Sequence, residues 1–173
     1  MNMEINPSEY KILIVDDVMS NVLLLKVLLT NEKFAIATAN NGRQALEQVD
    51  KEHPDLVLLD VMMPDLSGFE VAQRLKSNPD TADIPIIFLT ALNSTTDIVK
   101  GFQAGASDFI SKPFNKEELI IRVTHQVSLV AAKRIILNKT EELQRIIAGR
   151  DKLYSVIAHD LRSPMGSIKM VLN

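Results

Sequence analysis

The stretch Lys11-Ile-Leu-Ile-Val-Asp-Asp17 decides the fold, because four consecutive apolar residues are followed at once by two acids. The apolar run is continuous rather than alternating, which is typical of a parallel strand covered on both faces. Leu56-Val-Leu-Leu-Asp60 and Ile86-Ile-Phe-Leu-Thr90 repeat the pattern of an apolar run that ends in a polar residue. We therefore predict three central parallel strands with polar residues at their carboxyl ends.

Helix-like stretches separate these strands, each about ten residues long with apolar residues three or four positions apart. They cover 20–30, 42–52, 68–77 and 95–104, and a fifth helix is predicted from Asn115. The remaining strands are predicted at 34–39 and 109–111. Alternation of strands and helices predicts an α/β fold with an open, doubly wound parallel sheet, whose ligands bind outside the carboxyl ends of the strands.

Five polar residues at these strand ends are expected to meet at one edge of the sheet: Asp16, Asp17, Asp60, Thr90 and Lys112. Singly, each has a simpler explanation, because Asp often caps a helix or forms a turn and Thr is a common strand residue. Pro113, after the lysine, favours an extended backbone and permits a cis peptide. Three carboxylates at one place repel one another unless a divalent cation lies between them. Their conjunction favours a functional site.

The chemistry that suits these residues is phosphoryl transfer to Asp60. A carboxylate that attacks phosphorus needs positioning and charge neutralisation more than it needs a general base. Lys112 is expected to bind a phosphoryl oxygen, and Thr90 to donate a hydrogen bond to the new phosphate. The predicted ligands of Mg²⁺ are the oxygens that this ion prefers: Asp16, Asp17, Asp60 and the backbone carbonyl of Met62.

The motifs over residues 1–125 resemble the receiver domain of two-component response regulators. They are Val15-Asp-Asp17, Asp60-Val-Met-Met-Pro64 with Gly68, Leu89-Thr-Ala91, Gly101-Phe-Gln-Ala-Gly-Ala106 and Asp108-Phe-Ile-Ser-Lys-Pro-Phe114. The resemblance implies a flavodoxin-like sheet of order 2-1-3-4-5, phosphorylation of Asp60, and Mg²⁺ at the three acids. It also implies that Thr90 and Phe109 form a switch pair, although Phe109 has an alternative role as an ordinary core residue.

From Asn115 to Ser163 the sequence predicts one long helix, because no proline occurs and Glu118 follows Asn115 at capping-box spacing. A helix of this length needs a partner, so we predict a homodimer through a coiled coil over 115–163, with a signalling linker at 115–152. Arg134 and Glu141 interrupt the register, which predicts a discontinuity near 131–142. Two sets of apolar residues keep a three–four spacing: Ile120, Val123, Val127 and Val130, and then Ile136, Leu143, Ile146, Leu153 and Ile157.

The segment 153–173 contains a second motif, Tyr154-Ser-Val-Ile-Ala-His-Asp-Leu-Arg-Ser-Pro-Met-Gly-Ser167. A lone histidine on a helix is usually an ordinary surface residue, but this context resembles the phosphoacceptor segment of histidine kinases. The resemblance implies that His159 accepts phosphate from ATP, while Asp160 orients the imidazole or takes its proton. Ser163 stands where that family frequently has Thr or Asn.

The sequence ends inside the first helix of the expected phosphotransfer hairpin, and no ATP-binding domain follows. We therefore expect a fragment of a histidine protein kinase that is controlled by phosphorylation of Asp60. Its expected partners are a second copy of the chain, an upstream histidine kinase or phosphotransfer protein, and the missing ATP-binding domain. A transcriptional response regulator with coiled-coil dimerisation is one alternative. A Mg²⁺-dependent aspartyl-phosphate hydrolase is another, although such enzymes place a second Asp where this chain has Met62.

Composition limits the other possibilities. The chain is 46% hydrophobic and 24% charged, and it has no cysteine, which fits a cytoplasmic protein and excludes disulfides. Residues 1–113 hold 9 basic and 16 acidic residues (net −7), whereas 114–173 hold 10 and 6 (net +4). The basic residues of the second part are dispersed among acids, so we predict no nucleic-acid partner. No apolar run approaches the length that spans a bilayer, so no membrane partner is predicted either.

Overall fold

The structure, a computed structural model, describes residues 4–91 and 95–172, with side chains as far as His159. The chain divides into two compact units, one ending at Ala131 and one beginning at Ala132. The first unit holds the sheet, and the second is helical. Each is described by itself below.

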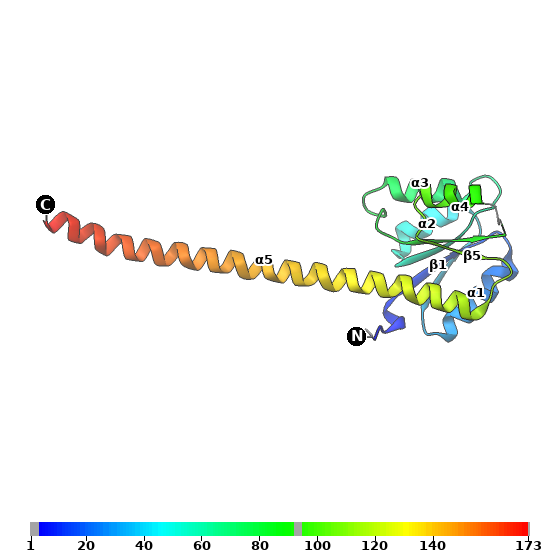
Figure 1. Ribbon diagram of the computed structural model, residues 1–173, viewed down its shortest axis with the longest axis horizontal. Helices are drawn as coiled ribbons and strands as arrows, with labels where there is room; N and C mark the ends of the chain where they lie inside the picture. Colours follow the sequence, from blue (N-terminus) through cyan, green and yellow to red (C-terminus); the bar gives the residue numbers. More distant parts are fainter. Residues whose placement is uncertain (1–3, 92–94, 173) are drawn as a thin grey trace. The chain divides into compact units, whose positions relative to one another are not determined.

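The first unit is built on a parallel sheet of five strands in the order β2-β1-β3-β4-β5 (Figure 1). The predicted fold class and strand order are therefore confirmed. The strand registers place Val15 beside Leu59, and Asp60 beside Leu89, so the strand ends meet at one edge. The strands are β1 Lys11–Val15, β2 Ala35–Ala39, β3 Leu56–Asp60, β4 Ile86–Thr90 and β5 Asp108–Ser111.

Helices cover both faces of the sheet, with α1 and α5 on one face and α2, α3 and α4 on the other (Figure 1). Their bounds lie within one or two residues of the predicted ones at all ends except that of α5. The helices are α1 Met19–Asn31, α2 Gly42–Glu52, α3 Gly68–Ser77, α4 Thr95–Gln103 and α5 Lys116–Leu172, and a short 3₁₀ helix, η1 Pro7–Glu9, precedes β1.

The continuous apolar runs are explained by this double cover. In β1, Ile12 and Ile14 face the α1 and α5 side, whereas Leu13 and Val15 face the α2 and α3 side. All four side chains are fully buried. A strand with two buried faces has no solvent side that would call for alternating polar residues.

Three of the helices begin with a side-chain cap. Asn41 accepts a hydrogen bond from the backbone N–H of Gln44 at α2, and Ser67 and Glu70 form a complete capping box at α3. Asn115 accepts a hydrogen bond from the N–H of Glu118 at 3.0 Å, as predicted. The carboxylate of Glu118 accepts instead from Arg122 Nε at 3.0 Å, so this cap is half of a capping box.

The first of the two apolar spacings on α5 requires a correction. Leu119, Val123 and Val127 are fully buried, and with Ala131 they pack into the core of the first unit. The spacing of Val123 and Val127 therefore serves the domain core and is not available for contact with another chain.

In the second unit, α5 continues as one helix to Leu172, beyond the predicted end at Ser163. The large apolar side chains between Ala132 and His159 are exposed. Within the described part of the chain, no helix is both long enough and apolar enough to cross a membrane.

Candidate functional site

Three carboxylates meet at the carboxyl edge of the sheet. Asp16 and Asp17 directly follow β1, and Asp60 is the last residue of β3. Their oxygens all lie within 4.8 Å of one another. Asp16 and Asp60 are buried, with 0% and 3% of their surface exposed, whereas Asp17 is exposed. The structure thus brings together the three acids that the sequence singled out.

Lys112 reaches the same cluster from the residue after β5. Its Nζ lies 3.0 Å from Asp16 Oδ2 and 3.0 Å from Asp60 Oδ1, and its side chain is 21% exposed. The peptide bond from Lys112 to Pro113 is cis. One ammonium therefore bridges the two buried carboxylates.

Backbone and amide donors hold the two buried acids in place. Asp16 accepts from the N–H of Val18 at 2.9 Å and from Asn21 Nδ2 at 3.2 Å. Asp60 Oδ1 accepts from the N–H of Met62 at 3.3 Å. Sequence reasoning missed Asn21, which lies in the first turn of α1, although its position five residues after Asp16 is a usable signal.

Burial and the neighbouring ammonium have opposite effects on the pKa of Asp60. Burial raises its pKa from 3.8 to about 6, helped by the charge of Asp16 and opposed by the hydrogen bond with Lys112. Burial lowers the pKa of Lys112, but the hydrogen bonds and charges of Asp60 and Asp16 outweigh that effect, so its pKa lies above the usual value. An extra positive charge at the cluster would favour the ionised form of Asp60.

The donor set fits a hard divalent cation. Three carboxylates face a single ammonium, which leaves two negative charges uncompensated when all three acids are ionised. Closely spaced carboxylate oxygens are the ligands that Mg²⁺ takes in proteins. The acidic triad is thus typical of a receiver Mg²⁺ site.

The start of α3 lies unusually close to the end of β3. A Cβ on Gly68 would lie 2.2 Å from the backbone oxygen of Asp60 and 2.9 Å from Val61 Cα. The N–H of Gly68 donates to the carbonyl of Val61 at 3.0 Å. Only glycine fits here, so Gly68 fixes the loop that follows Asp60.

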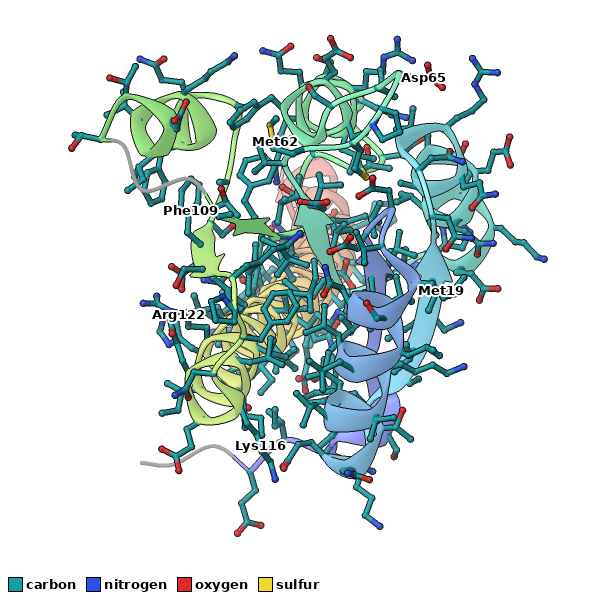
Figure 2. All side chains as sticks on the ribbon, turned by 90° about the vertical axis from the view of Figure 1, so that its right-hand side faces the viewer. Met19, Met62, Asp65, Phe109, Lys116 and Arg122 are labelled. Carbon is teal, nitrogen blue, oxygen red and sulfur yellow. The ribbon has the colours of Figure 1, made fainter. Side chains whose placement is uncertain are left out.

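Thr90 and Phe109 line one narrow space between β4, β5 and α4, together with Val61, Phe69, Asp97 and Ile98. The space is too small to hold a water molecule. Thr90 is buried, with 5% of its surface exposed, while Phe109 is partly buried. Figure 2 shows Met19, Met62 and Phe109 around the edge of the sheet that carries the acids. The two predicted switch residues, Thr90 and Phe109, therefore line the same small cavity.

The ring of Phe109 rests on α4. Its centroid lies 4.9 Å from that of Phe102 and 5.7 Å from that of Phe88. A Cβ on Gly101 would lie only 2.2 Å from Phe109 Cζ. The glycine leaves the room that the ring occupies.

Asp108 and Arg122 join the residue before Phe109 to α5, a connection that sequence reasoning missed. Arg122 Nη1 lies 2.8 Å from Asp108 Oδ1 and 2.9 Å from Oδ2, and Asp108 Oδ1 also accepts from the N–H of Phe109. The hydrogen bond with Asp108 raises the pKa of Arg122. Residues fourteen positions apart on different elements leave no periodic signal in the sequence.

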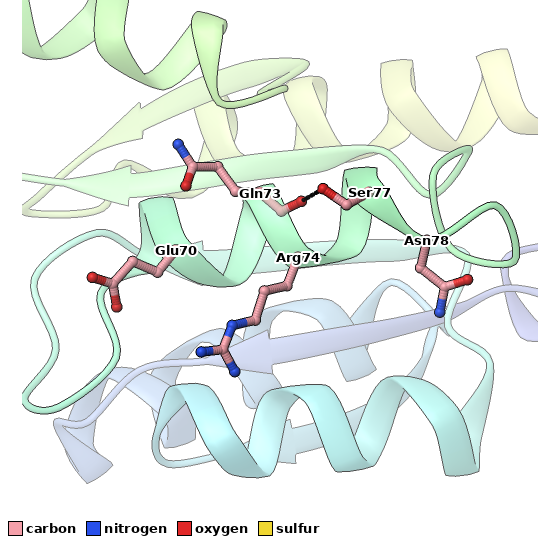
Figure 3. A pocket seen from close by; sticks show the side chains of 5 residues that line it. All are labelled: Glu70, Gln73, Arg74, Ser77 and Asn78. Carbon is pink, nitrogen blue, oxygen red and sulfur yellow. Dashed lines mark hydrogen bonds between the residues drawn. The ribbon is translucent and has the colours of Figure 1, made fainter.

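A surface pocket of about 560 Å³ lies elsewhere, along α3, and is lined by Glu70, Gln73, Arg74, Ser77 and Asn78 (Figure 3). Ser77 Oγ donates to the carbonyl of Gln73 at 2.7 Å within the same helix. None of the five predicted site residues lines this pocket, so volume alone does not identify the site.

The structure places His159 on α5 as an exposed side chain of the second unit. The predicted roles of Asp160 and Ser163 concern side chains outside the described residues. The second motif is therefore located on a helix, as expected.

The fold and the site together define a class: an open, doubly wound α/β domain with three acids and one lysine clustered at the carboxyl edge of its sheet. The response regulator receiver domain matches residues 12–124, and the chain belongs to that family. Membership implies an upstream kinase as the phosphodonor.

Three relatives illustrate the match. Response regulator PleD of Caulobacter vibrioides is 42% identical over 140 residues, which cover 81% of this chain and 30% of that protein. The receiver domain of a signal transduction histidine kinase from Syntrophus aciditrophicus is 35% identical with a TM-score of 0.65, covering 69% of this chain and 90% of that one. The receiver domain of sensor histidine kinase PA1611 from Pseudomonas aeruginosa PAO1, solved with magnesium in its active-site cleft, is 26% identical with a TM-score of 0.64, covering 69% and 98%.

The chain spans less than half the length of the curated relatives named as PleD, ycf27 and MtrA. Those matches therefore establish the receiver part of the chain.

Proposed function

We propose that Asp60 accepts a phosphoryl group in a Mg²⁺-dependent reaction, and that the resulting change is passed along α5 to control a histidine kinase whose own phosphoacceptor is His159. The observation that carries the first step is the buried Asp60 carboxylate, held 3.0 Å from Lys112 and within 4.8 Å of two further acids. The receiver domains of two histidine kinases among the similar structures support the second step.

In the proposed transfer, an oxygen of Asp60 attacks the phosphorus of the donor. The new O–P bond forms as the bond from phosphorus to the donor breaks, and its electron pair leaves with the donor. Lys112, already in contact with Asp60, binds a phosphoryl oxygen, and the hydroxyl of Thr90 donates to another. Asp16, Asp17, Asp60 and the carbonyl of Met62 would hold Mg²⁺, which supplies positive charge against the acids and the incoming group.

Acetyl phosphate with Mg²⁺ tests the acceptor. Intact-mass measurement should show one phosphoryl adduct on the wild type and none on Asp60→Asn. Asp65→Asn is the matched control, because Asp65 is an exposed acid of the same loop whose positive φ of 66° asparagine tolerates. An adduct that persists in Asp60→Asn contradicts the assignment.

His159 calls for a separate experiment. Because the chain contains no ATP-binding domain motif, we expect no phosphohistidine from ATP with this chain alone. Acid-labile, base-stable label should appear when an ATP-binding domain is supplied in trans, and His159→Gln should abolish it. His125→Gln, at another exposed histidine of α5, should not. Label that forms without the added domain contradicts the proposal, and salt-dependent DNA binding would favour a transcriptional regulator instead.

The proposed output requires two copies of the chain. A single chain leaves the apolar side chains of α5 beyond Ala131 exposed. A second copy in a parallel homodimer would bury them and stabilise the long helix. Analytical ultracentrifugation of the 173-residue chain checks this directly. A monomer at every concentration contradicts it.

A further inference from the structure

One side of α5 in the second unit carries a stripe of exposed apolar side chains. Each is three, four or seven residues from another member, which keeps them on one side of the helix. Three other exposed apolar side chains, Ile135, Leu137 and Val156, lie off this stripe. The stripe consists of Ile136 (64% exposed), Leu143 (58%), Ile146 (52%), Ile147 (56%), Leu153 (59%), Tyr154 (60%) and Ile157 (45%).

Arg150 stands at the centre of this stripe. Ile136, Leu143 and Ile157 are separated by seven and fourteen residues, and the position missing from the heptad series is 150. A charged side chain thus occupies a position that the heptad pattern assigns to an apolar one. The neighbours of Arg150 three and four residues away are all apolar: Ile146, Ile147, Leu153 and Tyr154.

Its own helix does not neutralise Arg150. Among the described residues it makes no ion pair, and no acid lies within one helical turn on the same side. Arg145 differs, since Glu141 and Glu142 precede it by four and three residues, as on an ordinary solvated face. Arg150 therefore differs from Arg145 in lying among apolar side chains with no acid three or four residues away.

A second copy of the chain is the occupant that this stripe fits. From Leu143 to Ile157 the stripe repeats every seven residues, so an identical helix in parallel register places Leu143 against Leu143 and Ile157 against Ile157. A helix of 28 residues is about 42 Å long and about 10 Å wide, which gives a contact strip on the order of 400 Å² per copy. That is about half of the roughly 800 Å² per partner that is typical of stable interfaces, so this part of the seam is weak and one unfavourable layer matters.

We propose that Arg150 is the weak point of this parallel seam between Leu143 and Ile157, where two like charges meet among apolar side chains. The inference rests on the homodimer in the proposed function. Two guanidinium groups at one layer repel each other and lose water, while the apolar layers at Leu143 and Leu153 hold the seam on either side. The helices separate most readily at this layer, nine residues before His159.

Substitution at Arg150 tests the inference. Arg150→Leu restores the heptad and should lower the dimer dissociation constant at least about tenfold, as measured by sedimentation equilibrium. Arg150→Lys keeps the charge and should stay within about twofold of the wild type. Arg145→Leu, on the other side of the helix, should not tighten the dimer. An Arg150→Leu dimer no tighter than the wild type overturns the proposal.

Cross-linking tests the register. The chain has no cysteine, so any disulfide must form at the introduced position. Leu143→Cys and Ile157→Cys should each form a disulfide-linked dimer under mild oxidation, whereas Arg145→Cys should not. If the cross-linked dimers form but Arg150→Leu does not tighten the dimer, the parallel register stands and the proposed role of Arg150 is wrong. A wild type and an Arg150→Leu variant that are both monomeric overturn the dimer as well.

Discussion

At the scale of single residues, Asp60 combines burial with the need to carry charge. Its folded pKa of about 6 lies above the value of 3.8 for a free side chain, so the native state binds the proton more tightly than the unfolded state. The stability contributed by the protonated form is complete below about pH 4 and is lost as pH rises through about 6. The ionised Asp60 therefore lowers the stability of the metal-free domain at neutral pH.

This predicts that Asp60→Asn stabilises the metal-free domain at pH 7. The shift corresponds to at most about 3 kcal/mol, and we expect a gain of about 1–3 kcal/mol in the free energy of unfolding by urea denaturation. The gain should shrink towards pH 4, where Asp60 is protonated in both states. Asp65→Asn should change little, and Mg²⁺ should stabilise the wild type but not Asp60→Asn. A gain that does not depend on pH would exclude ionisation as its cause.

We predict opposite effects on stability for the same substitution, glycine to alanine, at two helical positions, Gly149 and Gly101. Glycine to alanine normally stabilises a helix interior by about 1 kcal/mol. A Cβ added to Gly149 would have nothing within 4 Å, so Gly149→Ala should raise helicity and stability. Gly101→Ala places its Cβ against the ring of Phe109 and should instead cost about 1–3 kcal/mol. Circular dichroism during urea denaturation measures both, and stabilisation by Gly101→Ala would show that the ring of Phe109 moves freely.

At the scale of elements, β5 is tied to α5 by Asp108 and Arg122. Arg122 is 39% exposed, so its ion pair should contribute less than about 1 kcal/mol to stability. Its main effect is positional, because Asp108 also accepts from the N–H of Phe109. We expect Arg122→Gln to leave the melting temperature nearly unchanged while hydrogen exchange at the Phe109 amide accelerates. Arg122→Lys cannot contact both carboxylate oxygens as the guanidinium does, so it should accelerate exchange less. Unchanged exchange in both variants would show that the ion pair does not hold the Phe109 amide in place.

The elements also show what the sequence can predict. The continuous runs of β1, β3 and β4 were identified because a strand buried on both faces has a distinctive pattern, and strand ends of parallel sheets share an edge. The acids, Thr90 and Lys112 were therefore found together. The pair of Asp108 and Arg122 was missed because it is set by the packing of two different elements. Asn21 was missed although it lies only five residues after its partner, Asp16. The spacing of Val123 and Val127 was misassigned because an apolar stripe does not say what covers it.

At the scale of the whole molecule, α5 belongs to both units of the chain. In the proposed function, this continuity is the route by which phosphorylation would reach the second unit. Phosphate on Asp60 is expected to draw Thr90 inward and let Phe109 fill the space they share. Phe109 is joined through Asp108 and Arg122 to the start of α5. A bias of about 1–3 kcal/mol suffices to change the balance between two packings of a helical seam.

We therefore predict that beryllofluoride with Mg²⁺, an analogue of the phosphoryl group, alters the interchain distances along α5. Spin labels are placed at Lys133 and Lys152, one site per sample. Lys133 precedes the apolar stripe and Lys152 lies within it, two residues after Arg150, so the labels report the start of the seam and the region of Arg150. Both distance distributions should shift on occupancy of Asp60, and the shift at Lys152 should be smaller in Arg150→Leu, because a continuous apolar seam resists opening. Asp60→Asn should show no shift. Identical distributions at both sites despite confirmed occupancy would mean that the signal does not travel along this helix.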